Sequence, residues 1–427
     1  MPGGGYRSTP QCDMTLARHL HLRDHAHSLQ GRSSDRTTTV LALRQRYDPL
    51  GADHIGLEEH HRAASVEEAR DSSNHIHGAF ESSSGEEDLP GVIPGNEASA
   101  GLEFQFFEGS RDQLAAGIRR RKRIRENAFL QQHVGVLGIP KEQYGVRING
   151  ETLVTRKQKL TETYKRQVAD RGGVIILNHP SDFYARNLEY SIPFEQARLF
   201  DAVEVFNDVG PRRYGTNAAM TLAWTEANFF QRGLFPAVVS GHDDHGPITS
   251  SMRGPRWPSM LKILTPDGHA SEKAALAGIR ERATYVVQRA TLNNKEHKHL
   301  EDFAPETTME LVVDGSIGLG AQDLAFESDS PHQLEVQFND LPPFSTVELV
   351  YNGRTIRTDE VPRGGSLSAT ATFAAEAGAV HPDSGRRFGY VYAKVTVAKR
   401  PNVPARLQEH FRDRLYLCTS PVPFDVL

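Results

Sequence analysis

Residues 172–180 read Gly-Gly-Val-Ile-Ile-Leu-Asn-His-Pro, and this stretch decides the fold that we expect. Val174 to Leu177 form an uninterrupted apolar run, which is typical of a parallel strand that is buried on both faces. The polar triplet Asn178-His179-Pro180 follows the run directly. Side chains that directly follow the strands of a parallel barrel gather at its carboxyl-terminal face, where active sites are built. The stretch therefore predicts a buried strand that delivers His179 to a functional site.

Similar segments occur on both sides of this stretch. Expected strands cover residues 15–28, 51–57, 202–206 and 236–239, and residues 91–94 lead into a further one near Glu97. Expected helices cover residues 111–134, 155–171 and 221–231. Strands that alternate with helices in this way indicate a parallel barrel or an open α/β sheet.

The pattern changes near residue 306. Short β-rich runs, such as residues 334–338 and 347–351, are separated by Pro, Gly and Asn-Gly turns. Such turns connect antiparallel strands, so we expect a small antiparallel β-sandwich. The predicted domains are therefore an α/β domain over residues 1–304 and a β-sandwich over residues 305–427.

Composition narrows the class of protein. The net charge of −5, the apolar fraction of 38% and the charged fraction of 24% are those of a globular chain. No apolar run is long enough for a membrane span, and the first residues lack the features of a secretory signal. Cys12 and Cys418 are the only cysteines, which excludes a disulfide framework and a cysteine zinc site. We expect a cytoplasmic enzyme with a small-molecule substrate. Its slight acidity argues against a nucleic-acid partner, and a homo-oligomer stays open.

Histidine is the unusual residue in this composition. The chain contains 19 histidines, and nine of them precede residue 78. Several form His-x-His pairs in a strand-like context, where alternation places both rings on one face. Polar motifs follow six expected strands, namely His25-Ala26-His27 with His19-Leu20-His21 upstream, Glu58-Glu59-His60-His61, Pro94-Gly95-Asn96-Glu97, Asn178-His179-Pro180, Glu204 with Asn207, and Ser240 to His245.

Imidazole and carboxylate groups are the ligands that Zn²⁺, Mn²⁺ and Fe²⁺ prefer. Seven or more such groups exceed the needs of one ion, so the motifs predict two or three divalent ions. A carboxylate such as Glu97 can bridge two of them, as two-metal hydrolytic sites require.

The order of these motifs resembles that of the PHP (polymerase and histidinol phosphatase) family. Gly51 to His61 is similar to the family's "GLDFIAITDHN", and Val92 to Glu97 is similar to "VIPGIE". Gly172 to Pro180 is similar to "GGVVVLAHP", and Ser240 to His245 is similar to "GGSDAH". The stretch from Phe200 to Asn207 and the β-rich tail are similar to the CehA/McbA-like branch of that family.

The resemblance implies a distorted (β/α)7 barrel of PHP type over residues 1–304, with the β-sandwich behind it. It also implies the ligands. His25, His27, Glu97 and Asp243 would hold the first ion, Glu97 and His179 the second, and His60 and His245 the third. Two positions depart from the family pattern, because Glu59 replaces an aspartate and His242 replaces a serine.

The first motif permits two registers. In the one we favour, His25 and His27 are the family pair, and His19 and His21 lie further back along the strand. In the rival register, His19 and His21 bind the ion that Asp243 binds, and His27 joins His60 and His245.

The predicted activity is hydrolysis of a carboxylic ester, carbamate or amide of a small molecule by a metal-activated water. Glu97 and Asp243 would act at the metal centre, and His242 and Asp244 are candidates for protonating the leaving group. A phosphomonoesterase or phosphodiesterase is the alternative, and a non-catalytic metal-binding or interaction module is a second one. His133, at the end of the expected helix over residues 111–134, is interpreted as structural.

Overall fold

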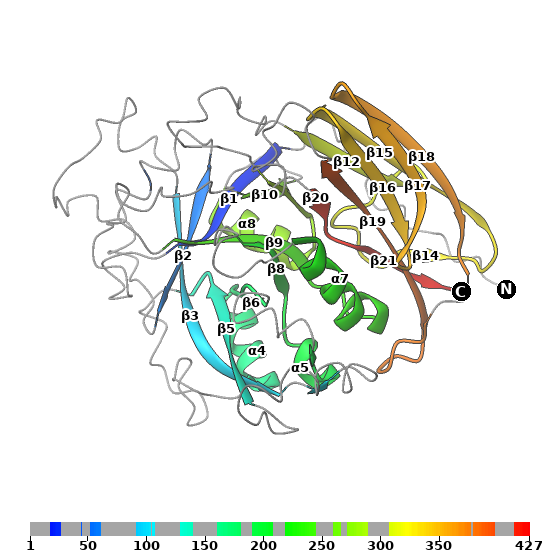
Figure 1. The fold of residues 1–427 in the computed structure, drawn as a ribbon. Coiled ribbons are helices and arrows are strands. Elements are labelled where there is room, and N and C mark those ends of the chain that lie inside the picture. The colour runs from blue at the N-terminus through cyan, green and yellow to red at the C-terminus, as the bar shows by residue number, and fades with distance from the viewer. Residues whose placement is uncertain are drawn as a thin grey trace, which may run out of the picture.

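The structure is a computed structural model. It describes residues 18–26, 44, 52–60, 91–103, 105–106, 129–139, 160–180, 190–207, 218–244, 259–265, 271–288, 307–376, 379–397 and 414–427. Figure 1 draws the remaining residues as a thin grey trace.

Seven strands form a closed ring (Figure 1). They are β1 (Arg18–Ala26), β2 (His54–His60), β3 (Gly91–Glu103), β5 (Phe129–Leu137), β6 (Val174–Leu177), β8 (Ala202–Asn207) and β9 (Ala237–Asp244). Each strand pairs with the next, and β9 pairs with β1 to close the ring. The strand expected over Val174–Leu177 is confirmed as β6, and all four of its residues are buried.

The ring mixes strand directions. β5 runs antiparallel to β3 and to β6, whereas the other five pairings are parallel. The carboxyl ends of β1, β2, β3, β6, β8 and β9 therefore point to the same end of the ring, which we call the carboxyl end. Its opposite is the amino end.

The predicted fold class, a distorted (β/α)7 barrel followed by a small β-sandwich, is wrong. The described residues are mostly strand, and antiparallel pairings prevail among them. The helices of the described part are few. They are α4 (Glu162–Asp170), α5 (Phe194–Ala197), α7 (Ala218–Asn228), α8 (Glu272–Arg280) and the short 3-10 helix η6 (Phe230–Arg232).

One segment shows the physical reason for this error. The helix expected over residues 111–134 ends within the strand β5. The last part of β5 reads His133-Val134-Gly135-Val136-Leu137, and valine and glycine are weak helix formers. Valine prefers the extended backbone of a strand, and in β5 the valines pair in the ladder between β3 and β6.

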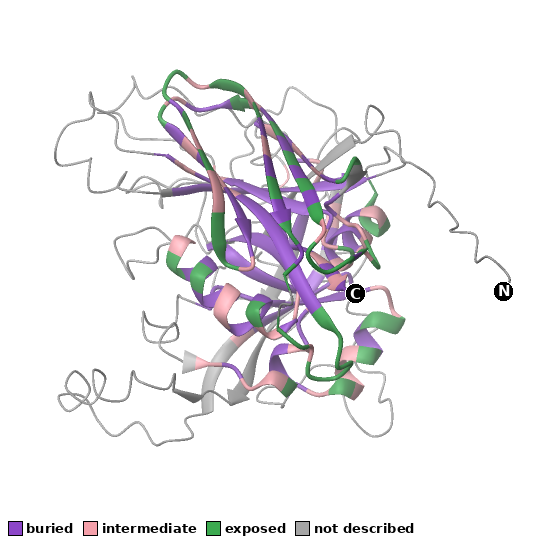
Figure 2. Ribbon diagram, turned by 90° about the vertical axis from the view of Figure 1, so that its right-hand side faces the viewer, coloured by how far each residue is buried: buried purple, intermediate pink, exposed green. Residues whose placement is uncertain are grey.

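The main sheet continues from the ring into the C-terminal strands. β10 (Ser259–Thr265) pairs with β1, β11 (Thr284–Gln288) pairs with β10, and β20 (Arg414–Thr419) pairs with β11. The result is a sheet of 15 strands that joins both halves of the chain. Figure 2 shows buried residues along these central strands and exposed residues on the outer strands and helix faces.

The C-terminal strands form two sheets around one core. The first contains β12 (Thr308–Val313), β13 (Ser316–Ile317), β15 (Pro331–Leu341) and β18 (Gly365–Ala374). The other strands are β14 (Ala325–Phe326), β16 (Ser345–Tyr351), β17 (Arg354–Val361), β19 (Arg387–Val397) and β21 (Val422–Val426), beside β20. Alternate residues of β15 are buried, so one of its faces packs on the shared core.

The Asn-Gly signal marks a tight hairpin between β16 and β17. Asn352 and Gly353 have φ angles of 46° and 77°, which a two-residue hairpin turn of this type requires. A separate pair of short strands, β4 (Gln105–Phe106) and β7 (Tyr190–Ser191), completes the described strands.

Helix α7 connects the ring to the C-terminal strands. The Glu226 carboxylate accepts hydrogen bonds from the Tyr390 and Tyr392 hydroxyls at 2.9 and 3.3 Å. The Cys418 side chain is fully buried in the hydrophobic core that the ring strands also line. Lys262, also buried, donates to the Thr307 carbonyl at 3.0 Å.

The predicted domain boundary at residues 304 and 305 lies outside the described residues and stays a prediction.

Helices that could cross a membrane are absent from the described ranges, where none is both long and apolar enough.

Candidate functional site

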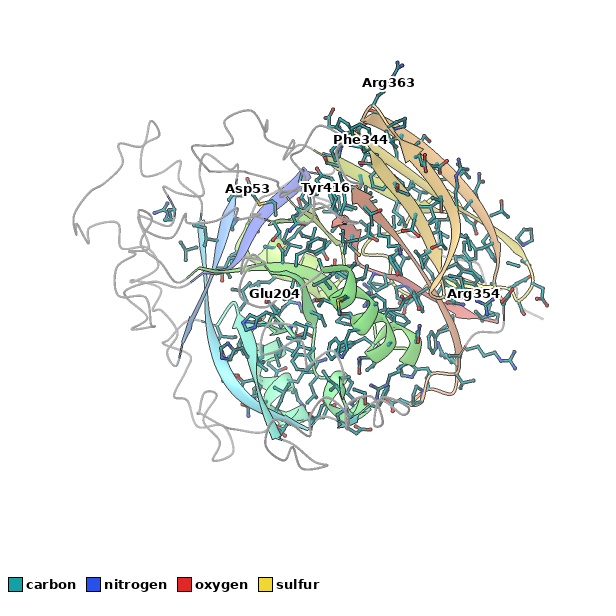
Figure 3. All side chains as sticks on the ribbon, in the orientation of Figure 1. Asp53, Glu204, Phe344, Arg354, Arg363 and Tyr416 are labelled. Atoms are coloured by element: carbon teal, nitrogen blue, oxygen red, sulfur yellow. The ribbon has the colours of Figure 1, made fainter. Side chains whose placement is uncertain are left out.

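Strand β6 ends between two neighbouring strands that both hold the residues after it. The Asn178 N–H donates to the His133 carbonyl of β5 at 3.2 Å. The His179 N–H donates to the Glu204 carboxylate of β8. Asn178, His179 and Glu204 are all buried, and Figure 3 labels Glu204 among the strands of the ring. The residues after β6 are therefore fixed from both sides at the carboxyl end.

His179 has an uncommon backbone. Its φ angle of 25° lies in the left-handed region, which favours glycine. A non-glycine residue in such a region costs on the order of 1–3 kcal/mol and persists only where its surroundings enforce it. Pro180 follows directly and restricts the same residue further. Backbone strain of this kind is concentrated at functional sites, so the feature marks His179 as a functional candidate.

His133 lies beside His179. The ring centroids are 5.1 Å apart with an interplanar angle of 72°, so one ring meets the other edge to face. The interpretation of His133 as a residue at the end of a helix is wrong, since the residue lies within β5. The sequence signal that could have found it is the alternating run Val134 to Leu137, which marks a strand that ends in a glycine.

The backbone register brings other predicted residues to the same end of the ring. Glu97 of β3 pairs with Gly135 of β5, two residues from His133, and His60 of β2 pairs with Glu97. The strands β2, β3 and β6 thus carry the predicted ligands His60, Glu97 and His179 towards the same end of the ring.

The register of β9 against β1 continues this arrangement. Asp24 pairs with Gly241, and Ala26 pairs with Asp244. His25 therefore lies along β1 opposite the segment that contains His242 and Asp243. Only the backbone is described at eight predicted positions, namely His19, His21, His25, His60, Glu97, His242, Asp243 and Asp244. His27 and His245 lie outside the described residues.

The other histidine pair lies elsewhere on β1. His19 pairs with Leu264 and His21 pairs with Lys262, both in β10. These positions are several residues before the carboxyl end of β1, whereas His25 is one residue from that end. The backbone thus places His25, and not His21, opposite the segment that contains Asp243, and the assignment of ligands remains a prediction.

Titratable groups at the amino end have structural partners. The Asp201 carboxylate precedes β8, accepts the Ile175 N–H at 2.9 Å and lies 3.6 Å from the Lys165 ammonium. Burial raises the pKa of Asp201 above its ordinary value, and the charge of Lys165 opposes this effect. At the start of β2, burial lowers the pKa of His54, and the charge of Asp53 opposes it.

The donors at the carboxyl end have the right chemistry for a metal ion. Imidazole nitrogens of His133 and His179 and carboxylate oxygens of Glu204 are of the types that Zn²⁺, Mn²⁺ and Fe²⁺ bind. Among the side chains that the structure describes, no group of three or more such residues is close enough to hold an ion. The remaining ligands of a complete site would come from β1, β2, β3 and β9.

Comparisons with known proteins add little to this geometry. No family model and no curated protein matches the chain. One solved structure that is similar to part of it is the CARDB domain of a Pyrococcus furiosus protein, determined by NMR in solution. The match has 12% identity, covers 28% of this chain and 95% of that domain, and has a TM-score of 0.17. Such a TM-score supports no argument about fold or function.

Proposed function

We propose that this protein is a metal-dependent hydrolase that cleaves an ester-type bond of a small molecule. The observation that carries the proposal is the buried His179, which has a left-handed backbone, contacts His133 and is held by Glu204. It lies at the end of the ring to which the register also brings His25, His60, Glu97 and Asp243.

The residue types support two or three divalent ions of Zn, Mn or Fe. We propose His25, His27, His60, Glu97, His179, Asp243 and His245 as ligands, and His133 joins them because its ring lies beside that of His179. When bound, the ions would supply a water of lowered pKa and positive charge for the oxyanion. The motif resemblance to PHP metallohydrolases agrees with this chemistry, and the proposal does not require the barrel of that family.

The protein's own residues would prepare the site. Asn178, His179, Glu204 and Ser240 are at most 2% exposed, so water has little access behind the ligands. A dry site strengthens the electrostatic interactions inside it. His242 and Asp244, beside the proposed ligand Asp243, are candidates for giving a proton to the leaving group.

We favour a carboxylic ester, carbamate or amide as the substrate bond. The test is a panel of chromogenic carboxylic esters, carbamates, anilides, phosphomonoesters and phosphodiesters, given to the full chain after loading with Zn²⁺, Mn²⁺ or Fe²⁺. We expect turnover of at least one non-phosphate substrate, its loss on chelation, and its loss in Asp243→Ala.

The matched control is Asp201→Asn, which changes a partly buried carboxyl at the amino end of the same strand pair and should retain turnover. Turnover of phosphoesters alone would replace the proposed bond by a phosphoester. A chain that holds metal but turns over none of the substrates would contradict catalysis and favour the binding module.

A further inference from the structure

Glu204 is a buried carboxylate at the candidate site that the proposed ligand set does not use. It is 2% exposed and comes from β8, the neighbour of β6. The last registered pair between these parallel strands is Leu177 with Val203. Glu204 follows Val203 directly, so its side chain stands where the ladder between the two strands stops.

The Glu204 carboxylate replaces a main-chain acceptor beyond the last pair of the ladder. Its oxygen accepts the N–H of His179, as a strand carbonyl would if β6 continued. This hydrogen bond holds a backbone that leaves the extended conformation, as the φ angle of 25° shows for His179.

The direction of the His179 ring depends on this backbone. The buried His179 ring meets the half-buried ring of His133 edge to face at 5.1 Å. Relaxation of His179 to an extended φ would rotate the bond from its α-carbon to its β-carbon and move the imidazole away from His133. The contact with Glu204 thus determines where the imidazole nitrogens lie.

We propose that Glu204 is a positioning residue, which fixes the His179 imidazole through the main chain and thereby raises the affinity of the site for a divalent ion. This inference rests on the proposed function for the role of His179, but the contact itself can be tested without activity. In this account, Glu204 need not bind the ion itself.

Three variants separate positioning from ligation. Glu204→Gln keeps a side-chain oxygen that accepts the His179 N–H at nearly the same reach, but it removes the negative charge. Glu204→Ala removes the acceptor. Asp201→Ala is the matched control, because Asp201 makes the same kind of contact from the start of β8 to the Ile175 N–H.

The first experiment measures amide hydrogen exchange at His179 in the metal-free full chain, by NMR with nitrogen-15 in histidine. We expect slow exchange in the wild type, Glu204→Gln and Asp201→Ala, and faster exchange by at least about tenfold in Glu204→Ala. Unchanged exchange in a folded Glu204→Ala would overturn the inference, whatever the protein hydrolyses. If Glu204→Ala does not fold, Glu204→Leu, which fills a similar volume but has no acceptor, takes its place, and unchanged exchange at His179 in that variant has the same consequence.

The second experiment measures affinity for Mn²⁺ and Zn²⁺ by competition with a chelating dye. Loss of a contact that supports a ligand typically costs roughly 10–100-fold in affinity, and we expect this for Glu204→Ala. Glu204→Gln should stay within about threefold of the wild type, because the acceptor is retained.

Equal losses in Glu204→Gln and Glu204→Ala would overturn positioning in favour of direct ligation. A wild type that binds neither ion would contradict the proposed function. The hydrogen-exchange comparison would then still decide whether Glu204 holds His179.

Discussion

The two ends of strand β8 carry the same kind of contact in different surroundings. At the amino end, Asp201 accepts the Ile175 N–H and has Lys165 as a counter-ion. At the carboxyl end, Glu204 accepts the His179 N–H, and His179 has a left-handed backbone and a second histidine at its ring.

We interpret the Asp201 contact as one that stabilises the fold, and the Glu204 contact as one that positions a residue of the candidate site. Ile175 lies within an ordinary strand, so its contact with Asp201 completes a ladder and satisfies a buried N–H. His179 lies beyond its strand in a costly conformation, beside the half-buried ring of a second histidine. We therefore expect changes at the carboxyl end to affect activity and changes at the amino end to affect stability.

The largest effect is expected from His179→Ala and Asp243→Ala. Each removes a proposed ligand and so disturbs both the occupancy and the position of an ion. Since even supporting contacts typically cost roughly 10–100-fold, we expect hydrolysis to be abolished within detection while the fold persists. Steady-state kinetics and circular dichroism measure the two properties. Retention of more than about a tenth of wild-type activity in either variant would refute the ligand assignment.

His133→Phe should have the next largest effect. Phenylalanine keeps an aromatic ring that can meet His179 edge to face, but it removes both ring nitrogens. If His133 contributes a nitrogen, kcat/KM should fall roughly 10–100-fold, and so should metal affinity. His133→Ala is the companion variant. Full activity in His133→Phe together with a loss in His133→Ala would show that the ring only packs.

Asp201→Ala should lower stability and leave kcat/KM unchanged. The substitution leaves the buried Ile175 N–H without its acceptor, and an unsatisfied buried group costs about 1–3 kcal/mol. The free energy of unfolding in urea measures this loss, and kinetics below the unfolding transition measure activity. A fall in kcat/KM as large as that of His133→Phe would remove the distinction between the two ends.

The smallest effect is a dependence of stability on pH. Burial raises the pKa of Asp201 above 3.8, although Lys165 opposes the shift. The folded chain then holds this proton more tightly than the unfolded chain, so its contribution to stability is largest at low pH and falls as pH rises through the folded pKa. Asp201→Asn lacks this proton.

We therefore expect the wild type to lose stability relative to Asp201→Asn as pH rises from about 4 towards neutrality. Urea unfolding of both proteins at several pH values gives the difference. A difference that stays constant, or that changes in favour of the wild type, would contradict the assignment.

Parts of the fold were accessible from the sequence. The apolar run Val174 to Leu177 identified β6 because it is short, follows two glycines and is rich in β-branched residues, as strands buried on both faces are. The Asn352-Gly353 pair identified a hairpin because both residues tolerate positive φ. These signals are local, and local patterns suffice to identify single elements.

The fold class was not accessible in the same way. The direction of β5 depends on its pairing with β3 and β6, which are distant in sequence, and no local pattern encodes it. The role of Glu204 depends equally on the neighbouring strand, because its partner is a main-chain N–H. Sequence motifs identify side chains of the types that bind metal ions. They do not identify a side chain whose partner is the main-chain N–H of a residue on another strand.

The central claim is that the carboxyl end of the ring holds metal through the residues around His179. The most direct test is the metal content of the full chain after gentle purification and reconstitution with Zn²⁺, Mn²⁺ or Fe²⁺, measured by inductively coupled plasma mass spectrometry. The account predicts at least about two equivalents in the wild type and fewer in His179→Ala, since each ion needs several ligands. A wild type that holds less than about one equivalent after reconstitution would contradict it.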